Sequence, residues 1–195
     1  MDYAGLFAQF GATDPGIAAS AERLFPKYEI HGLRLCHWLG QFAHESRGFT
    51  AFEENLSYSA ERLVKVWPNR FPTLKSALPY ARNPEALANK VYMFRMGNDE
   101  PGDGWKYRGR GPQLTGKENY ELAEKGTALP LVANPDLAAK PENFVLIACD
   151  FWKRNNCNPA ADDDNLVLVT RKINGGNIGL DARRQLVLKA KRLIL

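Results

Sequence analysis

Apolar residues recur at helical spacing along most of this 195-residue chain, and glycine, proline and asparagine separate the segments in which they do so. The strict alternation of apolar and polar residues that marks half-buried β-strands is rare. A period of 3.6 residues places the apolar side chains on one face of a helix. The chain is therefore predicted to be mainly α, with about six to eight helices.

The expected helices have recognisable ends. Asn83-Pro84 forms a good cap and first residue, Thr115 and Glu118 have the spacing of a capping box, and Asp164 is a further candidate cap. Glycines mark the expected stops. On this basis we expect helices over residues 31–46, 84–96, 115–125, from 141 onward, over 164–174 and from about 181.

Length and composition predict one soluble globular domain over residues 1–195, with a possible small helical lobe around 57–96. Of all residues 45% are hydrophobic and 25% are charged, which suits a single sizeable core. No apolar run approaches the roughly 18 to 20 residues that cross a bilayer, so stable membrane insertion is not expected. The first residues lack the basic region of an export signal, and we expect synthesis in the cytoplasm.

Charge and cysteine content exclude several classes of function. A formal net charge of +4, spread along the chain, favours an anionic surface, but no motif supports nucleic-acid binding. The odd set of Cys36, Cys149 and Cys157 predicts neither a disulfide framework nor a zinc site. His37 and His44 are seven apart, so the zinc-protease pattern of two histidines around a glutamate fails. No metal is expected, and the histidines are read as structural.

Two glutamates stand out as a possible acid and base. Cleavage of a glycosidic bond needs one protonated carboxyl and one ionised carboxylate. Glu45 falls in the last turn of a predicted buried helix, where it would be shielded and kept protonated by Trp38, Phe42, Phe49 and Phe52. Glu54, in a more polar segment, is better suited to take a proton from water. The alternative is that both are ordinary surface carboxylates.

The glycine-rich segment 101–116 is the second candidate for a site. It lacks the endings of a phosphate-binding loop and of a dinucleotide fingerprint. Gln113 and Thr115, two apart in an expected extended segment, would face the same side and suit sugar hydroxyls and an attacking water. The alternative is a turn followed by a helix cap at Thr115. Aromatic residues that could stack on sugars or belong to the core are Tyr58, Trp67, Tyr80, Trp105 and Tyr107.

Five segments in this order resemble glycoside hydrolase family 19, which contains chitinases and many phage or prophage endolysins. They read AHESRGF, EENLSYSAERL, YRGRGPQLTGKENY, KINGG and GLDARR, and the similarity runs from about residue 31 to the C-terminus. The resemblance implies a mainly helical, lysozyme-like domain with a substrate cleft. It also implies hydrolysis of β-1,4 links at N-acetylated sugars with inversion and without a cofactor.

The resemblance assigns roles to single residues. Glu45 corresponds to the general acid, Glu54 to the general base and Thr115 to the residue that holds the water. Gln113, Asn119 and Asn174 match substrate-cleft positions, and Arg183, with Arg184 as the alternative, matches an arginine near the carboxylates. Tyr107 and His44 are further candidates for substrate binding. GRGPQLTG is one residue shorter than the common family form, which leaves the placement of Arg108 and Arg110 open.

Among members of this family, the chain looks most like an endolysin that cuts bacterial peptidoglycan for host cell lysis. Such a protein would be made in the bacterial cytoplasm, act at the cell wall as a monomer, and depend on a holin-type pore to reach it. Two alternatives stay open. One is a chitinase that acts on chitin oligomers, and the other is a non-catalytic glycan-binding protein on the same scaffold.

Overall fold

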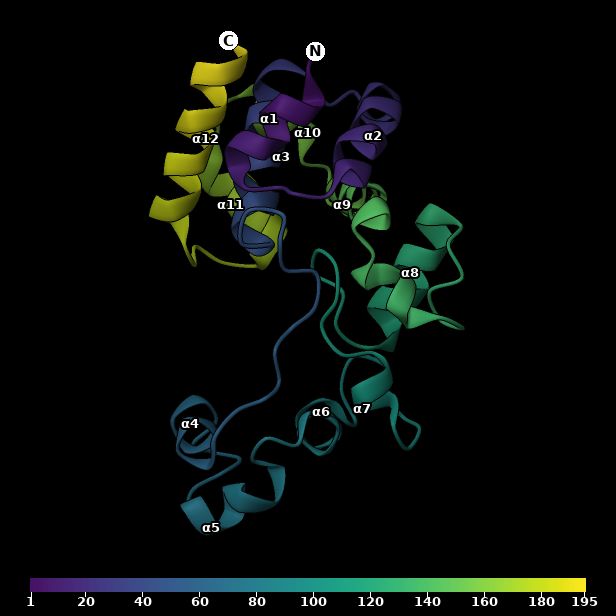
Figure 1. Ribbon diagram of the computed structural model, residues 1–195, viewed down its shortest axis with the longest axis vertical. Helices are drawn as coiled ribbons and strands as arrows, with labels where there is room; N and C mark the ends of the chain where they lie inside the picture. Colours follow the sequence, from purple (N-terminus) through teal and green to yellow (C-terminus); the bar gives the residue numbers. More distant parts are fainter.

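The computed structural model describes residues 1–195 and consists of helices joined by loops (Figure 1). No strand forms, and the only β-pairing is two isolated antiparallel bridges, Glu53 with Arg110 and Arg110 with Leu114. The prediction of a mainly α fold is therefore confirmed. The α-helices are α1 (Tyr3–Phe10), α2 (Pro15–Leu24), α3 (Gly32–Glu45), α4 (Ala60–Val66), α5 (Leu74–Ala77), α6 (Pro84–Tyr92), α7 (Asp103–Lys106), α8 (Lys117–Thr127), α9 (Pro141–Arg154), α10 (Asn158–Asp162), α11 (Leu166–Asn174) and α12 (Leu180–Ile194), with short 3-10 helices at Phe25–Tyr28, Leu78–Tyr80 and Pro135–Ala139.

The main core contains 29 buried residues and surrounds α3. Trp38 on α3 lies at its centre, with ring contacts to Phe7, Phe25 and Phe49. The most extensive helix contact joins α3 to α12. Gly40 permits this close approach, because a Cβ there would collide with Val187 of α12. The chain termini meet on this part of the molecule (Figure 1).

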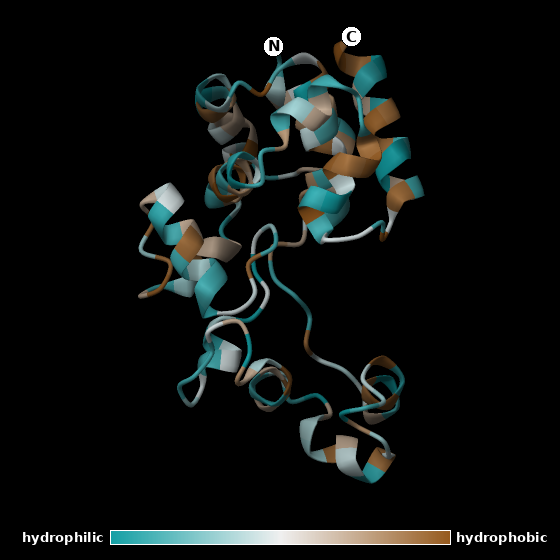
Figure 2. Cartoon of the chain, turned by 180° about the vertical axis from the view of Figure 1, so that it is seen from behind, coloured by the Kyte–Doolittle hydropathy of each residue, from teal (hydrophilic) through white to brown (hydrophobic).

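Two smaller clusters of buried residues lie outside the main core. One joins eight buried residues of α4 to α6 and the segment around them, including Leu63, Phe71 and Leu87. The other joins seven around α8 and its neighbours, including Tyr107 and Tyr120. In Figures 1 and 2 helices α4 to α6 stand apart from the main helical body, and the segment between α3 and α4 runs across the gap. None of the helices has the length and apolar character of a membrane span.

Several predicted helix ends differ from the structure. Helix α6 ends at Tyr92 and not at residue 96 as predicted, and Phe94 beyond it has a left-handed backbone and is 85% exposed. Asn165, not Asp164, caps α11, since its side chain accepts from the backbone N–H of Leu168. The predicted stop of α11 at Asn174-Gly175 is confirmed, because Gly175 is left-handed.

The helix count was also too low, with twelve α-helices in place of six to eight. Much of the difference comes from the N-terminal thirty residues and from short helices. Asp2 and Asp14 cap α1 and α2 through hydrogen bonds to backbone N–H groups, a signal present in the sequence. Helices of four or five residues, such as α5 and α7, are too short to show a hydrophobic period.

Candidate active site

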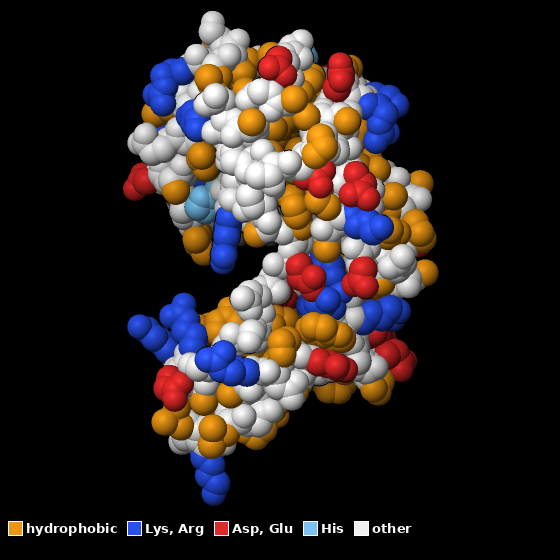
Figure 3. All heavy atoms as spheres, in the orientation of Figure 1, with side chains coloured by type: hydrophobic (Ala, Val, Ile, Leu, Met, Phe, Trp, Pro, Cys, Tyr) orange, Lys and Arg blue, Asp and Glu red, His pale blue; other side chains and the backbone are white.

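A groove of about 360 Å³ lies between the main helical body and the part formed by α4 to α7. Figure 3 shows it as a deep notch in the surface, with lysine and arginine side chains on both of its lips. Its lining comes from the end of α3 and the segment after it, together with the loop before α8. The lining residues are Glu45, Arg47, Ala51, Phe52, Glu53, Glu54, Asn55, Tyr58, Gly109, Arg110, Gly111, Gln113, Leu114 and Thr115.

Glu45 is the last residue of α3, and its carboxylate pairs with Arg183 of α12. Arg183 is almost fully buried and also donates to the side-chain oxygen of Gln41, at 2.6 Å, and to the carbonyl of Ile178, at 3.2 Å. Arg184 is exposed on α12, so Arg183 is the arginine that reaches a carboxylate. The ion pair agrees with the family resemblance, which places Arg183 near the carboxylates.

The expected shield of four aromatic residues around Glu45 does not form. Trp38, Phe42 and Phe49 are buried in the main core, and only Phe52 lines the groove that the 20% exposed side chain of Glu45 faces. Helical periodicity predicts which residues share a face of a helix. Glu45 is the last residue of α3, where the chain leaves the core, so its surroundings do not follow from that periodicity. The charged neighbour of the Glu45 carboxylate is therefore Arg183, and the carboxylate faces the groove.

His44 and Asn174 are not among the residues that line the groove. The ring of His44 lies against Gly179, where a Cβ would come within 2.5 Å of Nε2. Burial, and next the charge of Arg183, lower the pKa of His44. Asn174 donates to the carbonyl of Ile178 at 3.0 Å. Both residues therefore contact the loop before α12, which also supplies the Ile178 carbonyl to Arg183.

Glu54 is fixed by hydrogen bonds to both carboxylate oxygens. Tyr92 of α6 donates its hydroxyl to Oε2 at 2.7 Å, and the backbone N–H of Gly109 donates to Oε1 at 2.5 Å. The backbone N–H of Glu54 donates in turn to the carbonyl of Gly109 at 2.9 Å. Burial, and next the charge of Glu54, raise the pKa of Tyr92, so this hydroxyl keeps its proton and remains a donor.

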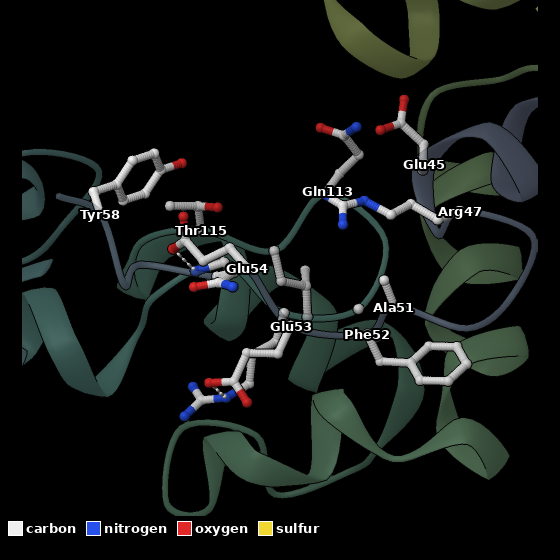
Figure 4. Close-up of a pocket in the computed structure, with 14 residues that line it drawn as sticks. Glu45, Arg47, Ala51, Phe52, Glu53, Glu54, Tyr58, Gln113 and Thr115 are labelled. Carbon is white, nitrogen blue, oxygen red and sulfur yellow. Dashed lines mark hydrogen bonds and ion pairs between the residues drawn. The ribbon is translucent and has the colours of Figure 1, made fainter. Parts of the chain in front are cut away.

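Gln113 and Thr115 both line the groove, but the predicted extended segment is wrong. Arg110 and Leu114 close a tight turn through mutual backbone hydrogen bonds, and Gln113 within it has a left-handed φ of 62°. Figure 4 shows Gln113 towards Glu45 and Thr115 towards Glu54. The two side chains therefore serve different ends of the groove.

The capping role expected for Thr115 is also wrong. The cap of α8 is Gly116, which makes no side-chain bond, and the helix continues through Gly126 to Thr127. The hydroxyl of Thr115 has no hydrogen-bond partner within the protein. Asn119, expected in the cleft, lies outside the groove lining and donates to the carbonyl of Thr115 at 2.7 Å. Asn119 therefore positions Thr115.

Tyr107 belongs to the core and not to the cleft. It is 1% exposed, its hydroxyl donates to the carbonyl of Val132 at 3.2 Å, and its ring packs against Tyr120. Of the aromatic residues considered from the sequence, Tyr58 is the one that lines the groove. Trp67 and Tyr80 pack against the cluster of α4 to α6. The guanidinium carbon of Arg108 lies 3.6 Å from the ring centre of Trp105.

The positions of Arg108 and Arg110, left open by the sequence, are set by Glu53. Arg108 pairs with the Glu53 carboxylate. Arg110 is buried, lies 3.6 Å from the same carboxylate and pairs with Asp136 at 2.5 Å. These pairs tie the segment that carries Glu54 to the loop before α8. Sequence reasoning missed Glu53 and Tyr92, although the adjacent acids Glu53-Glu54 facing an arginine-rich loop were a visible signal.

A helical molecule with two glutamates in one groove, one beside an arginine and one held by neutral donors, has the parts of an acid/base glycoside hydrolase. No protein-family model matches the chain. It is 39% identical to a glycosyl hydrolase family 19 domain-containing protein of Haemophilus influenzae over 80% of this chain and 78% of that protein. It is 43% identical to an endochitinase of Arabidopsis thaliana over 71% of this chain but only 38% of the plant protein, and 51% identical to an acidic endochitinase of Petunia hybrida over 25% and 18%. The chain belongs to glycoside hydrolase family 19.

Proposed function

We propose that this protein is an endolysin that hydrolyses the β-1,4 glycosidic bonds of bacterial peptidoglycan with inversion. The observation that carries the proposal is the presence of Glu45 and Glu54 in one groove, with Gln113 and Thr115 at its two ends. Family membership supports the hydrolase chemistry, and the remaining steps rest on the groove.

In this mechanism Glu45 gives a proton to the departing glycosidic oxygen. Arg183 then stabilises the carboxylate that remains, because a cation in direct contact favours the charged form. As the general acid, Glu45 must carry its proton when the substrate binds.

Glu54 takes a proton from a water molecule that attacks the anomeric carbon from the opposite face of the sugar. Its two hydrogen bonds, from Tyr92 and Gly109, hold the carboxylate in a fixed orientation in the groove. The free hydroxyl of Thr115 is available to hold this water. Inversion needs carboxyl groups about 6.5 to 9.5 Å apart, against roughly 5 to 5.5 Å for a retaining enzyme.

Charge supports peptidoglycan as the substrate. The protein carries a formal net charge of +4, and basic side chains flank the groove on both lips (Figure 3). Peptidoglycan is anionic, whereas chitin is neutral, so only the former gains from this field, and salt would screen the gain. The endochitinase relatives favour a second candidate, a chitinase that acts on chitin oligomers.

The biological role that fits this substrate is lysis of a bacterial host. We infer that the protein is made in the host cytoplasm, works as a monomer, and reaches the cell wall through a holin-type pore. Release of the protein by such a pore, and no clearing of intact cells without it, would support this setting. Clearing from within in the absence of any pore would contradict it.

Digestion of purified peptidoglycan, followed by mass spectrometry of the new reducing ends, tests the proposed function. New ends on N-acetylmuramic acid or on N-acetylglucosamine are expected and identify the bond. Anhydro ends would instead indicate transglycosylase chemistry, and cleavage of chitin oligomers alone would indicate a chitinase.

Two matched variants test the roles of the carboxylates. Glu45→Gln and Glu54→Gln keep the side-chain shape and remove the acid or the base, and each should lower the rate by at least about a hundredfold. Clearing of permeabilised bacteria at the wild-type rate by either variant would refute its role. Binding without cleavage by the wild type would point to the glycan-binding protein.

A further inference from the structure

One arginine side chain in the groove forms no ion pair or hydrogen bond with the rest of the protein. Two arginines line it, Arg47 and Arg110. Arg110 is buried and paired with acidic side chains. Arg47 is exposed, and its guanidinium takes part in no hydrogen bond or ion pair, although Glu45 is only two residues away.

Each acidic residue of the groove has a partner other than Arg47. Glu45 pairs with Arg183, and Glu53 pairs with Arg108. Glu54 receives hydrogen bonds on both oxygens from neutral donors. The charge of Arg47 is therefore left over on the wall of the groove, available to a group that comes from outside.

The backbone that carries Arg47 is fixed, so its side chain starts from a defined place. Arg47 follows the end of α3 with a left-handed φ of 51°, and its carbonyl accepts the hydroxyl of Thr50 at 2.8 Å. The buried hydroxyl of Ser46 bridges the carbonyl of Phe42, at 2.6 Å, and the N–H of Phe49, at 2.9 Å. In Figure 4 the Arg47 side chain extends from this anchored turn into the groove towards Gln113.

We propose that Arg47 determines substrate specificity by binding a carboxylate of peptidoglycan next to the bond that Glu45 protonates. The inference rests on the proposed function and names the part of the substrate that the groove reads. Peptidoglycan carries carboxylates on the lactyl group or stem peptide of alternate sugars, whereas chitin has none. A guanidinium forms two parallel hydrogen bonds to a carboxylate, so an arginine suits this contact better than a lysine.

The test pairs a change in the protein with a change in the substrate. Native peptidoglycan is compared with peptidoglycan whose carboxyl groups have been converted to methylamides, using wild type, Arg47→Gln and a control. The control is Arg23→Gln. Arg23 is exposed on α2 and has no ion pair, and its substitution by glutamine removes the same charge as Arg47→Gln does. Circular dichroism and thermal unfolding check that each variant is folded.

On native peptidoglycan, Arg47→Gln should lower kcat/KM roughly ten- to hundredfold, as expected for a charged hydrogen bond. On the methylamide substrate, kcat/KM of the wild type should be lower than on native peptidoglycan by the same factor. For Arg47→Gln, kcat/KM should be the same on both substrates. Arg47→Lys should recover part of the rate, and Arg23→Gln should behave as wild type. This pattern is specific to a contact between Arg47 and a carboxylate.

An equal loss by Arg47→Gln on both substrates would overturn the inference, since the arginine would then serve catalysis or folding. A wild-type rate for Arg47→Gln on native peptidoglycan would overturn it as well. Both results leave the proposed function intact, because the wild type cleaves peptidoglycan in each. Failure of the wild type to cleave native peptidoglycan would instead refute the proposed function and the inference with it.

Discussion

Arg183 in the last helix pairs with Glu45 at the end of α3, 138 positions earlier in the chain. The pair closes the contact between α12 and α3, which is also the contact that Gly40 makes possible. The C-terminal helix therefore does more than cover the core. It supplies the charge beside the proposed acid.

Arg183→Met should destabilise the protein by about 2 to 4 kcal/mol. The change leaves Glu45 without its cation and the buried oxygen of Gln41 without its donor, and the 20% exposure of the Glu45 side chain keeps the cost below that of a fully buried pair. Urea unfolding measures the loss. Arg183→Lys, which retains the charge, should lose less. Equal stability of Arg183→Met and wild type would show that the pair contributes nothing to folding.

Gly109→Ala should reduce kcat about tenfold or more while the protein stays folded. A Cβ at this position would lie 3.0 Å from the carboxyl carbon of Glu54, so the carboxylate must move from its place. Steady-state kinetics on peptidoglycan fragments reports the effect. Gly176→Ala is the matched control, since a Cβ there meets nothing within 4 Å. An unchanged kcat would mean that the position of Glu54 is not critical.

Thr115→Ala should slow catalysis and leave the free energy of unfolding within about 0.5 kcal/mol of wild type. The reason is that the hydroxyl has no partner in the protein and caps no helix, because Gly116 precedes α8. Thr115→Ser should retain most of the activity. Parallel unfolding and rate measurements separate the two effects, and a loss of about 1 kcal/mol or more would restore the capping role.

Stability should fall as the pH is lowered from about 7.5 to 5.5. Burial lowers the pKa of His37 below its ordinary 6.5, against the opposing influence of Asp164. The unfolded chain therefore binds a proton at a higher pH than the folded protein does. Stability is fully present above about 6.5 and is lost as the pH falls towards the folded pKa.

Denaturant unfolding at the two pH values measures this slope. His37→Gln should make it shallower without removing it, because the pKa of His44 is also lowered by burial. A slope of the same size in the variant would show that His37 makes no contribution.

Local pattern was enough to predict the parts of the site that lie on regular helices. The period of residues 31–46 identified the helix that ends at Glu45, and Asn174-Gly175 marked the end of α11 correctly. The positions of Glu45, Glu54, Gln113 and Thr115 in one groove agree with the hypothesis that they act together. Their catalytic roles remain predictions.

The contacts that fix these side chains could not be read from local pattern. Tyr92 meets Glu54 only because α6 lies beside the segment after α3, a contact between residues 38 positions apart in the chain. The turn at Gln113 arises from pairing between Arg110 and Leu114, which no spacing rule predicts for a non-glycine residue. Tyr107 was assigned to the cleft by residue type and Asn119 by the family resemblance, but Tyr107 is buried and Asn119 donates to the carbonyl of Thr115.

The unequal sizes of the buried clusters have a consequence for heating. Helices α4 to α6 share only eight buried residues, against 29 in the main core, and α6 carries the tyrosine that holds Glu54. A region with few buried contacts opens more readily than the rest of a protein. We therefore expect backbone amides there to exchange with solvent first, and catalysis to fail at a temperature at which most of the helical signal survives.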